Sequence, residues 1–165
     1  MALQLEQAHI GHQANHIARH VDVDKLETLI CLESLIVVCY QSLSGLLHNH
    51  TIHRECQQFE KHARYHQKKL REIFPLSPKS EVAIEVKVDH HLLHLKPSYL
   101  SLREVINLSI NLTVLKTDIY KYFYHTVQEH HELLYGLLED NSEEMDFLRQ
   151  EMNSYKNRLV TCLEF

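Results

Sequence analysis

The chain has little of what interrupts a helix. It contains three glycines, three prolines and no tryptophan in 165 residues. Glycine and proline punctuate turns, so their scarcity favours long helices over a sheet with many tight turns. A chain of this length buries about 70 % of its unfolded surface, so it needs neither a metal nor a disulfide to fold. The sequence predicts one all-α domain over residues 1–165.

Several function classes lack their usual signals. The formal net charge is -5, and no cluster of basic residues is present to neutralise nucleic-acid phosphates. No apolar run approaches the roughly 20 residues that span a bilayer, and residues 1–20 lack the apolar core of a signal peptide. Glycines stand alone at Gly11, Gly45 and Gly136, so there is no phosphate-binding loop. We expect a cytoplasmic protein that binds neither nucleic acid nor membrane.

The cysteines form no metal-binding or disulfide pattern. No two of them have CxxC spacing, and each stands in an apolar helical pattern. Such cysteines behave as small buried hydrophobic residues. We therefore expect free thiols at Cys31, Cys39, Cys56 and Cys162.

Hydrophobic periodicity predicts four main helices and an accessory one. The main helices are expected at about 24–48, 52–74, 98–138 and 142–163, after an amphipathic accessory helix over Leu3–His20. Capping-box spacing marks two of the starts, with Asp24 before Glu27 and Asn141 before Glu144. These elements predict an antiparallel four-helix bundle.

The segment from Pro75 to Pro97 shows no helical period. Val82, Ile84, Val86 and Val88 alternate with polar residues there, which predicts a short strand. An extended segment of this length reaches about 70 Å, whereas a 25-residue helix is only about 38 Å long. The segment can therefore cross the bundle and deliver the third main helix parallel to the second.

Four polar residues fall on or beside the apolar stripes, where a charge is costly unless it is paired or bound to a metal. Glu33 has apolar helical neighbours on every side. His66 lies in the stripe of the second main helix, with His62 one turn earlier, and Glu151 flanks the stripe of the fourth. We take Glu33, His62, His66 and Glu151 as candidate metal ligands.

The spacing of these residues resembles the ferritin-like superfamily, in particular its rubrerythrin type, over about residues 24–163. That family has a Glu seven residues before a Tyr on its first and third helices, and Glu-x-x-His on its second and fourth. Glu33 precedes Tyr40 by seven residues, and the second helix contains Phe59-Glu60-Lys61-His62-Ala63. The chain keeps three ligand types, Glu33, His62 and Glu151, and has Phe59, Thr117 and Ser154 where the others are expected.

The resemblance implies that the surviving ligands serve one iron position and that the coupled di-iron centre is lost, along with ferroxidation and dioxygen activation. Two interpretations stay open. Glu33, His62 and Glu151, with His66 as a spare ligand, could hold a single Fe, Mn or Zn ion. Alternatively, they could form a metal-free polar core with Tyr40 and Tyr155, so that no cofactor is bound.

Other histidines could also chelate metals, but a solvated helix face explains them as well. His12, His16 and His20 recur every four residues, and His90, His91 and His94 stand near the end of the crossover. Two functions follow. The first is a non-catalytic ferritin-like binding or scaffold protein, a homodimer or the binder of an unknown protein partner, with the strand Val82 to Val88 as a pairing edge. The second is a mononuclear metalloprotein.

Overall fold

Helices account for nearly all of the described chain. The computed structural model describes the backbone of residues 21–163 and the side chains of residues 21–159. The accessory helix predicted over Leu3–His20 lies outside this range. No strand occurs within the described range, which confirms the all-α prediction. The elements are α2 (Val23–Leu46), α3 (His50–Ile73), α4 (Pro78–Leu95), the 3-10 turn η1 (Pro97–Tyr99), α5 (Leu102–Thr126) and α6 (His131–Leu163).

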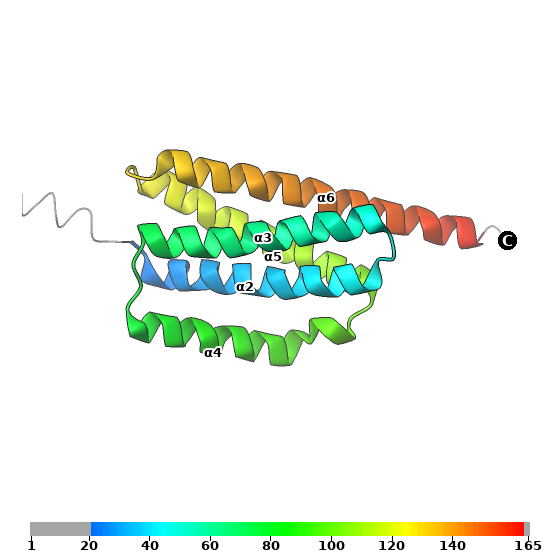
Figure 1. Cartoon of the computed structure of the whole chain (residues 1–165), viewed down its shortest axis with the longest axis horizontal. Coiled ribbons are helices and arrows are strands. Elements are labelled where there is room, and N and C mark those ends of the chain that lie inside the picture. The colour runs from blue at the N-terminus through cyan, green and yellow to red at the C-terminus, as the bar shows by residue number, and fades with distance from the viewer. Residues whose placement is uncertain (1–20, 164–165) are drawn as a thin grey trace, which may run out of the picture.

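Helix α2 is the centre of the arrangement. It packs against α3, α4 and α5, and α6 packs along α5. Figure 1 shows that α3 and α5 run opposite to α2, whereas α4 and α6 run in its direction. The last turns of α6 project past the ends of the other helices (Figure 1). Helix α4 and η1 therefore connect α3 to α5, and α3 and α5 run in the same direction (Figure 1).

Helix α2 is also the most apolar helix. It is the one described helix that is long and apolar enough to cross a membrane, with a mean hydropathy of 1.7 over its most apolar 18 residues. However, 61 % of that window is buried inside the fold, as in the core helix of a bundle.

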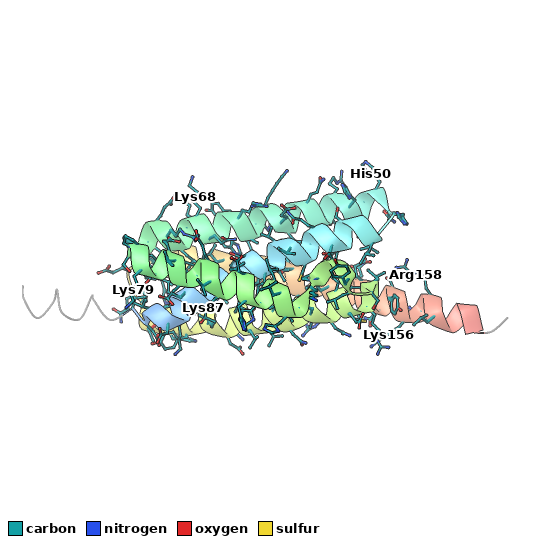
Figure 2. The ribbon with its side chains drawn as sticks, turned by 90° about the horizontal axis from the view of Figure 1, so that it is seen from below. His50, Lys68, Lys79, Lys87, Lys156 and Arg158 are labelled. Carbon is teal, nitrogen blue, oxygen red and sulfur yellow. The ribbon has the colours of Figure 1, made fainter. Side chains whose placement is uncertain are left out.

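The crossover is a helix, and the strand predicted over Val82 to Val88 is wrong. The Ser77 side chain caps α4 by accepting from the Ser80 backbone N–H, and Pro78 occupies the first turn, where proline is favoured. Ile84 is buried against the bundle, whereas Val82 and Val86 are exposed. Packing on α2 outweighs the weak β preference of the valines. Figure 2 views the molecule from the α4 side, with Lys79 and Lys87 labelled on this helix.

The predicted N-cap of α2, the start of α5 and the break between α5 and α6 are also wrong. Helix α2 is capped by Asp22, whose side chain accepts from Lys25 N at 3.1 Å, and Glu27 instead pairs with Lys87. Helix α5 begins at a capping box formed by Ser101 and Glu104, after η1. The break predicted at 139–141 lies at residues 127–130 instead. Asn141 is therefore buried inside α6 rather than at its start.

Two apolar clusters fill the interior, one toward each end of the bundle. The cluster at the C-terminal end of α2 includes Leu35, Ala63, Leu112 and Phe147. The cluster at the N-terminal end includes Ile30, Leu70, Tyr120 and Leu137. Helices α3, α5 and α6 change from one cluster to the other in their central parts, and α2 changes between Ile30 and Cys31. Polar residues stand at or near these positions.

Candidate functional site: a buried charged cluster

Five ionisable side chains meet at the junction of the two apolar clusters. They come from four helices, each from the level at which its apolar stripe passes from one cluster to the other. All are buried except Asp140, whose side chain is 32 % exposed. We call them the charged cluster: Glu33 on α2, His66 on α3, Lys116 on α5, and Asp140 and Glu144 on α6.

Lys116 is the centre of the charged cluster. Its Nζ donates to Glu33 Oε2 at 3.1 Å and to Glu144 Oε2 at 2.6 Å. The residue has no exposed surface, so its ammonium group has exchanged water for two carboxylates. A buried ammonium is tolerated only when it is paired and hydrogen-bonded in this way.

His66 joins the cluster to the surface. Its Nδ1 lies 3.0 Å from Glu33 Oε1, and its Nε2 lies 2.9 Å from Asp140 Oδ2. Carboxylate oxygens only accept hydrogen bonds, so both contacts are satisfied when both ring nitrogens carry a proton. The geometry therefore favours a buried imidazolium between two carboxylates.

Two hydroxyl groups complete the hydrogen bonding of the Glu33 and Glu144 carboxylates. Tyr120 donates its phenol proton to Glu33 Oε1 at 2.8 Å. Thr113 Oγ1 lies 2.9 Å from Glu144 Oε1 and 2.9 Å from the Ser109 carbonyl oxygen. Every carboxylate oxygen of Glu33 and Glu144 thus has a partner, as expected of buried polar groups in a stable core.

The pKa values follow from these contacts. Burial by itself raises the pKa of Glu33, but the Lys116 and His66 charges and the hydrogen bonds outweigh it and lower that pKa to about 2. Burial works against the charged form of Lys116 too, yet Glu144 and Glu33 raise its pKa. For His66, the Glu33 charge and the Asp140 contact outweigh burial and raise the pKa above 6.5. The cluster thus favours the charged form of these three groups.

The structure brings together two of the four predicted ligands. Glu33 and His66 are in contact, as described above. His62 lies one turn along α3, with 6.5 Å between its ring centroid and that of His66, and its buried Nδ1 has no hydrogen-bond partner. Glu151 is buried two turns past Glu144 on α6, and its Oε2 has no partner.

Aromatic rings fill the level of His62. Phe59, which stands where the resemblance expects a ligand, stacks on Tyr40 at 5.5 Å between centroids and lies 5.1 Å from Phe147. Thr117 donates to the Thr113 carbonyl oxygen of its own helix. These side chains contribute packing at this level and no ligand.

The charged cluster does not suit a metal ion. Metal binding needs a lone pair on the imidazole, but both nitrogens of His66 face carboxylates. The space between Glu33 and Glu144, where a cation bridging two carboxylates would lie, holds the Lys116 ammonium. Within residues 21–159, no three His, Cys, Asp or Glu side chains form a group that could hold a metal.

Sequence reasoning missed three members of the cluster, Lys116, Asp140 and Glu144. Lys116 shares one helical stripe with Leu112, Tyr120 and Phe123, all of them buried. That stripe is the signal that could have found it. Glu144 was read as part of a helix cap, although it also stands one turn before Leu148 on a buried stripe.

The fold and the site define a class: an all-helical protein with a lysine-centred ionic cluster in its core. The chain matches no protein-family model, no curated protein and no solved structure.

Proposed function

We propose that this chain is a ferritin-like four-helix protein without a di-iron centre, which acts as a non-catalytic binding or oligomeric scaffold. The observation that carries the proposal is the position of Lys116. Its ammonium lies between carboxylates from α2 and α6, where a bridging cation would lie in a metal protein. A fixed positive charge there supplies the neutralisation that a metal ion supplies in a carboxylate site.

A metal titration tests the core. We expect full-length protein, produced without a metal-affinity tag, to bind no Fe²⁺ or Mn²⁺ at the charged cluster. Removal of the ammonium in Lys116→Ala leaves the two carboxylates facing each other, so this variant should gain affinity for a divalent cation. Calorimetry measures the affinity of the wild type and of Lys116→Ala for the ion, and elemental analysis measures how much metal each protein holds.

The alternative, a mononuclear metalloprotein, makes the opposite prediction. About one equivalent of Fe or Mn in the wild type, lost in Glu33→Gln, would overturn the scaffold proposal. The double variant His62→Gln with Glu151→Gln then distinguishes the ligand set predicted from the sequence from the charged cluster.

The outer face of α4 supports a scaffold role, with a second copy of this chain as its partner. Val86 and Leu93 are 62 % and 70 % exposed, and they lie with Val82 on one stripe of the helix. Lys79 and Asp89 stand on the same stripe, on opposite sides of Ile84. When two copies of α4 pair antiparallel about a two-fold axis near Ile84, Lys79 of each meets Asp89 of the other.

Sedimentation analysis tests this pairing. We expect a homodimer that Val82→Lys with Val86→Lys converts to a monomer, because in this register Val82 of each copy meets Val86 of the other. The matched control is Val114→Lys with Leu115→Lys, which alters two exposed apolar residues of α5 and should leave the dimer intact. A wild-type monomer, or equal loss of the dimer in both variants, would contradict the α4 interface.

A further inference from the structure

We propose that His90 and His94 on α4 form a second, separate site that chelates one divalent transition-metal ion. The two residues are four positions apart, so they stand one turn apart on the same face of the helix. Their Nε2 atoms are 3.2 Å apart, and their ring centroids are 4.4 Å apart. Both residues are exposed, so an ion reaches them directly from solvent.

The distance between the two nitrogens suits two neighbouring ligands of one ion. Imidazole nitrogens at about 2.0–2.1 Å from a metal lie roughly 2.9 Å apart at a right angle and roughly 3.4 Å apart at the tetrahedral angle. The observed separation of 3.2 Å falls between these values. The pair is therefore already spaced for chelation. A hydrogen bond between the two Nε2 atoms accounts for this spacing, and its proton moves to Nδ1 or to solvent when an ion binds.

Two imidazoles also determine which ions are bound. Imidazole suits copper, nickel and zinc, whereas magnesium, calcium and manganese prefer oxygen ligands. Among the divalent first-row metals, Cu²⁺ generally binds most tightly to a site with nitrogen ligands. Two protein ligands leave coordination positions for water or for a donor on another molecule. The site shares no residue with the charged cluster, so it does not depend on whether the core binds a metal. It does stand on α4 beside the surface proposed for the dimer, because His90 follows Val86 by one helical turn.

The other histidines must be separated from this pair in any test, because the chain has 15 of them. His12, His16 and His20 have the same four-residue spacing. The starting protein is therefore the untagged full chain with all three changed to Gln. Within α4, His91 tests the choice of pair. It is exposed and stands three positions before His94, so its loss would also weaken binding if the ion were held by His91 and His94 instead.

Calorimetric titration with Cu²⁺, and then with Ni²⁺ and Zn²⁺, tests the site. We expect one equivalent to bind, with affinity at least tenfold lower in His90→Gln and in His94→Gln but unchanged in His91→Gln. Circular dichroism confirms that each variant keeps its helices. Equal affinity in all three variants, or no binding in the starting protein, would overturn the proposal. Fe²⁺ or Mn²⁺ binding at the core would contradict only the proposed function.

Discussion

Two buried glutamates of this protein have opposite acid–base behaviour. Glu33 and Glu151 both lie in the core, and burial acts to raise the pKa of each. Glu33 nevertheless has its pKa lowered to about 2, whereas the pKa of Glu151 is raised. Glu33 has Lys116, His66 and Tyr120 as partners, and Glu151 Oε2 has none. Partners rather than depth decide which form of a buried acid is stable.

A similar difference separates the buried carboxylates at two levels of the bundle, although the buried amide of Asn141, next to Asp140, also has no partner. In the charged cluster each carboxylate oxygen of Glu33 and Glu144 has a partner. At the level of His62 and Glu151, each of the two side chains has a buried polar atom without a partner. A network of this kind fixes how four helices meet, because its members come from α2, α3, α5 and α6. The charged cluster is therefore better suited to holding the bundle together than to receiving a substrate.

The largest effect is expected on removing the central cation. Lys116→Met leaves two buried carboxylates without their ammonium partner, which should lower the free energy of unfolding by about 3–5 kcal/mol. Urea unfolding followed by circular dichroism measures it. The matched control is Lys121→Met, because Lys121 is an exposed lysine of the same helix and should change stability by less than about 0.5 kcal/mol.

A double variant shows whether charge is the cause of that loss. Glu33→Gln with Lys116→Met removes one charge of each sign, so the two effects should be less than additive. A loss of less than about 1 kcal/mol of unfolding free energy in Lys116→Met alone would show that the ammonium contributes little to stability. Glu33 and Glu151 would then differ in their contacts but not in what those contacts contribute to stability.

Stability should also depend on pH in two separate ranges. The lowered pKa of Glu33 stabilises the fold above pH 4.5, and this contribution of roughly 3 kcal/mol is lost as the pH falls from 4.5 toward 2. The raised pKa of His66 stabilises the fold below pH 6.5. This contribution is lost as the pH rises from 6.5 through the raised pKa. Unfolding free energies across pH 3–9 measure both, with a maximum expected between 4.5 and 6.5.

Single variants assign each limb of that profile. His66→Gln should flatten the alkaline limb and keep an acid limb, while Glu33→Gln should weaken the acid limb. A profile unchanged by either substitution would contradict the ionic description of the charged cluster.

The sequence was sufficient for what depends on local pattern. Helical periodicity is local, so α2 and α3 could be placed to within about two residues at each end. Glu33 and His66 were found because a polar residue inside an apolar stripe stands out. The ferritin-like resemblance and the scaffold function stay predictions.

What the sequence could not provide depends on residues far apart in the chain. Lys116 is buried because Glu33, 83 residues away, and Glu144, 28 residues away, meet its ammonium. The apolar stripe of α5 indicates that Lys116 is buried, but the sequence alone does not show which carboxylates meet its ammonium. The side chain selected on this helix was Thr117, and a shift of one residue turns the side chain by about 100° around the helix axis. Helix α4 was missed for a similar reason, since its packing on α2 decides its structure.

The smallest expected change in stability tests the comparison of Glu33 with Glu151 most directly, because substitution by Gln should have opposite effects at the two residues. Glu33→Gln should destabilise the protein at pH 7, because it removes the charge that Lys116 and His66 need. Glu151→Gln should leave stability unchanged or raise it, since burial without a partner for Oε2 raises the pKa of this carboxyl and disfavours its charge in the folded state. Urea unfolding at pH 7 measures both variants side by side. A loss of more than about 1 kcal/mol in Glu151→Gln would mean that Glu151 has a charge-dependent partner, and the level of His62 would again become a candidate for the ligand set predicted from the sequence.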